Sequence, residues 1–189
     1  MPIKRTGGDR AKVTAAVHNL GQQEGKVGWF ESAKYANGAP VAGVAYVQEH
    51  GSAKRSIPPR PYFRPTVAER KTAWAKTAGD VSRAVLEGHL SPDASTEALC
   101  LAAEGDVRKA ISKLTTPALS PLTILARKER QIRSRQTKGQ MQGGLTGKDI
   151  GRLAARLDQG PQDVSGVSTK PLVDSGLMLA TLTSQVNKK

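Results

Sequence analysis

The sequence has few of the residues that most often carry chemistry. Its 189 residues include one cysteine, three histidines and only 4% aromatic residues. Cys100 alone can form neither an internal disulfide nor a cysteine metal cage, and we expect it at a buried helix position. The histidines are scattered, without the spacing of a zinc site or of an activated nucleophile. The sequence therefore predicts no catalytic residue, no metal site and no cofactor, and we expect that the protein is not an enzyme.

Long apolar runs are also missing. No segment approaches the roughly twenty apolar residues of a membrane span, and the opening residues MPIKRTGG lack the apolar core of a signal peptide. We expect a soluble protein, made in the cytoplasm, that does not contact a membrane. The hydrophobic fraction is 38%, which predicts a thin core and argues against a sealed active-site cavity.

Positive charge is abundant and unevenly placed. The net charge is +13. Residues 1–60 carry nine Lys and Arg against four acids, residues 61–114 eight against seven, and residues 115–189 twelve against five. The excess therefore lies toward the two ends of the chain, where it could meet DNA phosphates or acidic subunits, or simply form a solvated surface.

The chain is organised around residues 40–65. Apolar residues at three- and four-residue intervals predict a short helix over 40–50, with Gly51 as its cap. The sequence IPPRP at 57–61 cannot be helical, because each proline fixes φ and forces the preceding residue into an extended conformation. Pro65 can then open a long helix in its first turn. Glu49 and His50 could form an acid–base pair, but neighbours on a helix face different directions.

The extended segment, which we call the strap, has two interpretations. It either wraps its own domain or crosses to a neighbouring subunit, because a preformed extended segment loses little entropy when it docks. The adjacent aromatic residues at its end must be buried or meet a partner. On the second interpretation the subunit contacts are Ile57, Pro58, Pro59, Arg60, Pro61, Tyr62 and Phe63. Lys54 and Arg55 beside them are candidates for contacts with acidic partners.

The remaining pattern predicts an α+β fold, in which a small antiparallel sheet is packed by several helices and carries a basic extended insertion. We expect a single domain over 1–189 with a flexible arm at 1–8. The predicted helices follow residue 9, cover 65–86 and 92–114, and open again at Ser120-Pro121. The strand at Lys26–Glu31 should pair with a final strand at 181–186.

A basic segment follows the short helix that opens at Ser120-Pro121. It contains Arg127, Lys128, Arg130, Arg133, Arg135 and Lys138, opposed only by Glu129. Such a segment repels itself, so we predict that it is poorly ordered alone and that 126–168 is an insertion or arm. A local helix is expected over 146–157. The six cations are candidate contacts to phosphates or to an acidic partner.

Four blocks of sequence resemble one protein family. They are Gln48-Glu49-His50-Gly51 followed by IPPRPYFRP, Gly105–Ile111 (GDVRKAI), Pro117–Ile124 (PALSPLTI) with Arg127 after it, and Lys170–Leu177 (KPLVDSGL). In this order they resemble the virion morphogenesis and tail completion proteins of long-tailed bacteriophages, over most of residues 26–187. The family more often has an aromatic residue at the position of His50.

The resemblance implies a structural virion protein at the head–tail junction. The expected role is a ring-forming subunit, in six or twelve copies, that connects the head connector to the tail tube. Its partners would be other neck, connector and tail proteins, with packaged DNA as a further candidate, and it would be made in the host cytoplasm. The family has no catalytic residues to transfer. The alternatives are a tail terminator and a nucleic-acid-binding module that contacts DNA through its basic arms.

Overall fold

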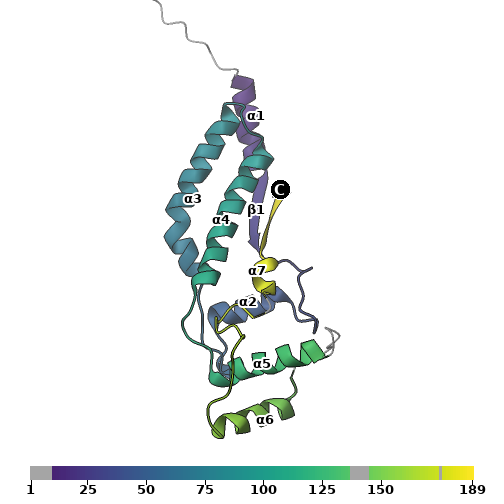
Figure 1. Cartoon of the computed structure of the whole chain (residues 1–189). Coiled ribbons are helices and arrows are strands. Elements are labelled where there is room, and N and C mark those ends of the chain that lie inside the picture. The colour runs from purple at the N-terminus through teal and green to yellow at the C-terminus, as the bar shows by residue number, and fades with distance from the viewer. Residues whose placement is uncertain (1–9, 137–144, 175) are drawn as a thin grey trace, which may run out of the picture. The chain divides into compact units, whose positions relative to one another are not determined.

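The protein is mostly helical with one small sheet (Figure 1). The computed structural model describes residues 10–136, 145–174 and 176–189. The elements are α1 (Arg10–Gly21), β1 (Gln23–Gly28), α2 (Val41–His50), the 3-10 turn η1 (Ala53–Arg55), α3 (Phe63–Leu86), α4 (Pro92–Lys113), α5 (Pro121–Gln136), α6 (Gly147–Asp158), α7 (Leu177–Ala180) and β2 (Thr183–Lys188). The predicted α+β class is confirmed. No described helix combines the length and the apolar character needed to cross a membrane.

The chain divides into two compact units, where the sequence led us to expect one domain. Unit 1 holds the chain up to Gly28 together with 64–108 and 182–189. Unit 2 holds 29–63 and 109–181. Each unit brings together segments that are far apart in the sequence. The predicted arm at 1–8 lies outside the described residues.

Unit 1 contains the sheet and most of the long helices. β1 and β2 pair antiparallel, with Gly25 opposite Val186 and Val27 opposite Ser184, which confirms the predicted pairing of the two ends of the chain. α4 lies beside the sheet, and α3 lies on the other side of α4 (Figure 1). The predicted cap of α4 is present, because the Ser91 Oγ accepts a hydrogen bond from the Ala94 N–H at 3.2 Å.

The first strand lies earlier than predicted. We expected Lys26–Glu31, but β1 covers Gln23–Gly28 and ends before Trp29 and Phe30. Gly25 lets the strand lie directly against α4, because a Cβ there would collide with the Cys100 Sγ. Trp29 lies outside the sheet, and its Nε1–H donates to the Met178 carbonyl of unit 2 at 2.8 Å. The tertiary contact of Trp29 therefore overrides its β propensity.

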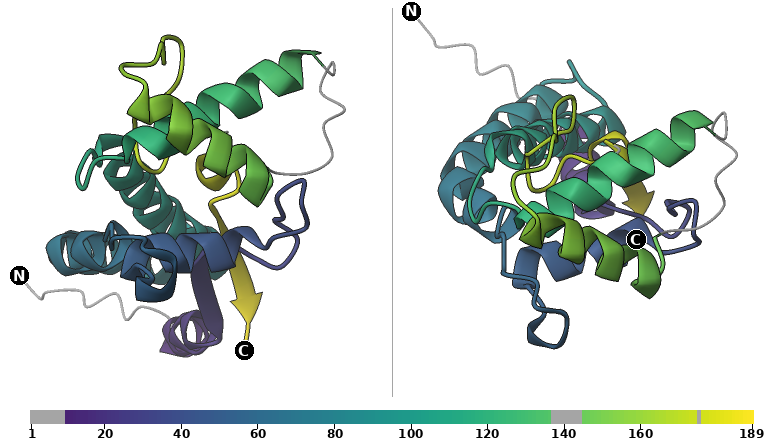
Figure 2. Two further views of the ribbon diagram at one scale, coloured as in Figure 1. Left: turned by 90° about the horizontal axis from the view of Figure 1, so that it is seen from below. Right: turned by 60° about the horizontal axis from the view of Figure 1, so that its bottom comes forward.

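Unit 2 is built on α2, α5, α6 and α7. α5 and α6 lie side by side in both views of Figure 2. Buried residues of α5 (Leu125, Ala126) and α6 (Leu153) form a small core, with Leu122, Leu145, Ile150, Leu157 and Val164 packed against it. The predicted helix over 146–157 is confirmed by α6 at Gly147–Asp158.

Most of the basic segment is helical, which differs from the prediction. We expected a short helix followed by an extended, poorly ordered stretch, but α5 continues to Gln136 and carries most of the basic residues. The reason is that carboxylates and backbone carbonyls elsewhere in unit 2 bind these charges. Lys138 lies outside the described residues.

Candidate functional site

Glu49 anchors the strap to the helices on both sides of it. The carboxylate belongs to the last turn of α2, is only 4% exposed, and accepts hydrogen bonds from the backbone N–H groups of Tyr62 (2.7 Å) and Phe63 (2.9 Å). The first N–H groups of a helix have no partner within it, and the partial positive charge there favours an anion. Glu49 therefore caps α3 and fixes the end of α2 to the start of α3.

His50 takes no part in this contact. Its ring is exposed, stacks on Tyr46 with the ring centroids 4.3 Å apart, and has its Nδ1 3.1 Å from the Tyr46 carbonyl oxygen. Glu49 instead is buried against the start of α3. The two side chains therefore serve different contacts, and they do not form the acid–base pair considered from the sequence.

Tyr62 is the buried aromatic residue at the end of the strap. It is 2% exposed, donates its hydroxyl to the Ala45 carbonyl at 3.1 Å, and packs edge-to-face against Trp29 with the ring centroids 6.0 Å apart. Burial raises the pKa of Tyr62 well above its ordinary value, and the charges of Glu49 and Tyr35 add to the shift. The hydroxyl therefore stays protonated and keeps donating to α2.

Arg60 binds the strap to α2 and to the loop before α5. Its guanidinium is buried and donates to the carbonyls of Pro117 (3.1 Å) and Ala118 (3.4 Å) and to the side-chain oxygen of Gln48 (3.2 Å). Burial lowers the pKa of Arg60. Its backbone N–H also donates to the Gln48 carbonyl at 2.7 Å. The arginine thus ties α2 to the loop that precedes α5.

The seven residues predicted as subunit contacts divide into three groups. The side chains of Arg60 and Tyr62 are buried within unit 2, and those of Ile57 and Phe63 are partly buried. The exposed ones are Pro58, Pro59 and Pro61. The strap therefore wraps α2 of its own unit through alternate residues, while its prolines face solvent and are open to another chain.

Arg127 is a structural residue and differs from the exposed contact that the sequence suggested. Its buried guanidinium donates to four backbone carbonyls, those of Ser168, Lys170, Pro171 and Val173, at 2.8 to 3.2 Å. Burial lowers the pKa of Arg127, Asp174 raises it, and Arg130 and Arg60 lower it further. The group stays charged and fixes the loop between α6 and α7 onto α5.

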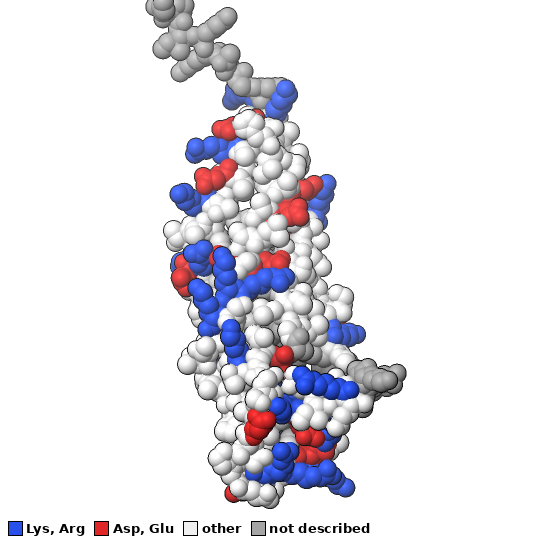
Figure 3. Space-filling model, viewed as in Figure 1, with Lys and Arg blue, Asp and Glu red and all other residues white. Residues whose placement is uncertain are grey.

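The other predicted cations of α5 are mostly paired as well. Lys128 donates to the Ser165 carbonyl at 2.6 Å, and Arg130 pairs with Asp174 at 2.8 Å. Arg135 is exposed and has no partner among the residues that the structure describes. On the face shown in Figure 3, Lys and Arg side chains over α5 and α6 lie among Asp and Glu side chains. Most of the basic side chains of this segment therefore bind partners within unit 2.

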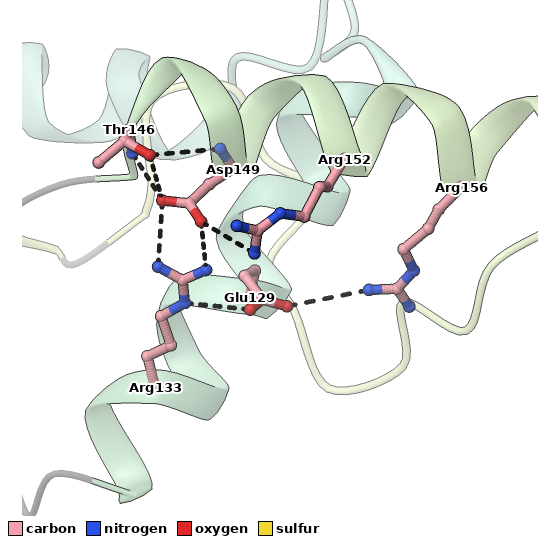
Figure 4. A network of polar contacts seen from close by, with 6 residues as sticks. All are labelled: Glu129, Arg133, Thr146, Asp149, Arg152 and Arg156. Atoms are coloured by element: carbon pink, nitrogen blue, oxygen red, sulfur yellow. Dashed lines mark hydrogen bonds and ion pairs between the residues drawn. The ribbon is translucent and has the colours of Figure 1, made fainter.

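Arg133 joins α5 to α6 through a network of charged groups (Figure 4). Its guanidinium bonds both carboxylate oxygens of Asp149, at 2.8 and 3.2 Å, and one oxygen of Glu129 at 3.0 Å. Asp149 and Thr146 form a capping box at the start of α6. Arg133 first, and then Thr146, hold the pKa of Asp149 well below its ordinary value. The spacing Thr146-x-x-Asp149 is the sequence signal that could have revealed the capping box.

Unit 2 also contains an open hollow of about 770 Å³. It is lined by α2 (Val44, Gln48), the strap (Ile57, Pro58, Arg60), α5 (Thr123, Arg127, Arg130), the start of α7 (Leu177) and the loops that carry Tyr35, Leu119 and Asp174. Composition argued against a sealed active-site cavity, and this hollow is open to solvent. The lining comes from segments between residues 35 and 178, so no local pattern could have indicated it.

Most of the charged side chains of unit 2 described above bond one another or backbone carbonyls. In the described ranges no group of three or more His, Cys, Asp and Glu side chains could hold a metal ion. No family model matches the chain, and neither a curated protein nor a solved structure matches it.

Proposed function

We propose that the protein is a structural subunit of a tailed-bacteriophage virion. In this proposal it acts at the head–tail junction, as a neck or tail completion protein, and assembles into a ring that joins the head connector to the tail tube. It performs no catalysis there. Its function is to match two surfaces and hold them together.

The main support is that three of the four sequence blocks on which the resemblance rests contact one another in unit 2. Arg60 of the first block donates to the carbonyls of Pro117 and Ala118 in the third. Arg127, which follows the third block, donates to the carbonyls of Lys170, Pro171 and Val173 in the fourth. Two buried arginines therefore join blocks that the sequence separates, as expected if the blocks are parts of one structural unit.

Unit 1 contains elements with little buried surface, and these favour assembly with further copies. α1 has no buried residue, and Val17 on it is 55% exposed. In the part of the chain that the structure describes, the sheet has two strands. Isolated helices of about twelve residues and two-stranded sheets are both marginal in water. A neighbouring subunit that covers these elements would supply the missing burial.

Ring formation can be tested by native mass spectrometry of the full chain. We expect a closed oligomer of six or twelve subunits. Val17→Glu should shift the population toward the monomer, because a charge would be buried at the contact. Ala15→Glu is the matched control, since residues two apart on a helix point to nearly opposite sides. A wild-type chain that is monomeric at all concentrations would contradict the ring.

The position in the virion is tested by electron microscopy of particles assembled without the protein. Filled heads together with free tails of normal length are expected for a tail completion protein. Tails of abnormal length would instead indicate the alternative role of tail terminator. Normal infectious particles would reject the proposal altogether.

Nucleic-acid binding through the basic segment remains the competing hypothesis. It is less favoured, because Arg127, Arg130 and Arg133 already have partners within unit 2. If it were correct, affinity for DNA would fall steeply with salt and would depend on Arg135. No retention of the full chain on a DNA column at low salt would exclude it.

A further inference from the structure

The hollow of unit 2 has an unusual balance of charge. Three guanidinium groups line it, those of Arg60, Arg127 and Arg130. Among its described lining residues Asp174 supplies the one carboxylate, which lies 2.8 Å from Arg130 and 3.5 Å from Arg127. Three positive charges thus face one negative charge, and an anion entering the hollow would be attracted.

The arginines differ in their freedom to bind a further group. The guanidiniums of Arg60 and Arg127 are buried and bonded to backbone carbonyls, so they act mainly as fixed positive charges. Arg130 is 42% exposed at its side chain, and its one partner among the described residues is the carboxylate of Asp174, which is itself 42% exposed. Arg130 is therefore the group that can exchange one carboxylate for another.

The rest of the lining is largely apolar. Val44, Ile57, Pro58, Leu119, Leu172, Leu177 and Met178 face the same hollow as the arginines. Its volume of about 770 Å³ lies within the range of about 300–1,000 Å³ typical of ligand pockets. Such a surface suits a segment in which apolar side chains alternate with carboxylates.

We propose that this hollow binds an acidic, partly apolar peptide segment of another protein, with a carboxylate of that segment on Arg130. Charge complementarity argues against a segment of a second copy as the occupant. Residues 1–8 carry Lys4 and Arg5 and no acid, the strap carries Arg60, and the chain ends in Lys188-Lys189. The inference does not depend on ring formation.

Asp174 occupies the position that the partner's carboxylate would take. Its carboxylate bonds Arg130. Burial raises the pKa of Tyr35, another lining residue, and the negative charge of Asp174 is the second cause of that rise. Removing the charge of Asp174 should free Arg130 and raise the affinity for an acidic segment. Removing the charge of Arg130 should do the opposite.

The test uses the full chain and a fluorescein-labelled peptide of alternating Leu and Glu, followed by fluorescence anisotropy at low salt. The same peptide with Gln in place of Glu is the control ligand. We expect binding of the Glu peptide only, about tenfold weaker with Arg130→Gln, several-fold tighter with Asp174→Asn, and unchanged with Arg135→Gln. Arg135 lies on the same helix and does not line the hollow.

Three outcomes would overturn the inference. They are equal binding of both peptides, an equal loss with Arg135→Gln and Arg130→Gln, and full displacement of the Glu peptide by low millimolar inorganic phosphate. The second would indicate general attraction by a basic surface, and the third a small-anion site. Circular dichroism of each variant confirms that it is folded. Because peptide binding is measured apart from oligomer mass and virion assembly, its failure and that of the proposed function can be told apart.

Discussion

Removing the charge of Glu49 should weaken the connection between α2 and α3. The carboxylate is 4% exposed and accepts two hydrogen bonds from the backbone at the start of α3. Hydrogen bonds to a charged group contribute about 1.5–3 kcal/mol each, against about 1 for neutral pairs, and a charge at a helix terminus adds up to about 2 kcal/mol.

These magnitudes separate two substitutions. Glu49→Gln keeps an acceptor oxygen but loses the charge, so the free energy of unfolding should fall by about 2 kcal/mol. Glu49→Ala removes the oxygen that accepts from both N–H groups and opens a small cavity, so the loss should reach about 4 kcal/mol. Either is large beside a total stability of about 5–15 kcal/mol.

The assay is urea denaturation followed by tryptophan fluorescence. The chain has two tryptophans, Trp29 in unit 2 and Trp74 in unit 1. In a Trp74→Phe background the signal comes from Trp29, which packs against Tyr62 beside the substituted residue. Glu31→Gln, at an exposed acid of the same unit, is the control and should change stability by less than about 0.5 kcal/mol. If Glu49→Gln matched this control, the capping argument would be refuted.

Three further predictions follow from other contacts. Arg127→Lys should cost about 3 kcal/mol in urea denaturation, because an ammonium cannot replace the fork that reaches four carbonyls; a loss below about 0.5 kcal/mol would contradict this. The folded-state pKa of Asp149 is lowered from the ordinary value of 3.8. The ionised carboxylate therefore stabilises the fold above pH 3.8, and this stabilisation is lost as the pH falls further. Asp149→Asn should therefore flatten the acid limb of a circular dichroism titration, whereas the exposed Asp158→Asn should not, and identical curves would argue against the network. Gly25→Ala should destabilise the protein by about 1–3 kcal/mol through collision with the Cys100 Sγ, and Cys100→Ala in the same chain should restore most of the loss. The absence of such rescue would mean that the two residues do not meet.

The sequence identified the elements that local rules control. The helix at 40–50, the break imposed by IPPRP, the long helix near Pro65 and the Ser91 cap of α4 all depend on residues within one or two turns of each other. Proline geometry and capping act at that range, so they can be read without the fold.

The basic segment was harder to interpret because its charges are neutralised by distant groups. Arg127 depends on carbonyls some forty residues away, and Arg133 depends on Asp149. Viewed alone, the segment resembles a disordered arm. In the structure, the same charges hold α5 to α6 and to the loop before α7.

By itself, the sequence determined the helices near 40–50, 65–86 and 92–114, the extended strap between the first two, and the excess of basic residues outside the middle of the chain, because these properties depend on neighbouring residues and on composition. Only the tertiary structure decided that Glu49 caps α3, that Arg60 and Arg127 are buried, and that a hollow with three arginines forms between residues 35 and 178. The physical reason is that burial and charge pairing are properties of positions in space, and the chain brings those positions together from segments that carry no local sign of one another.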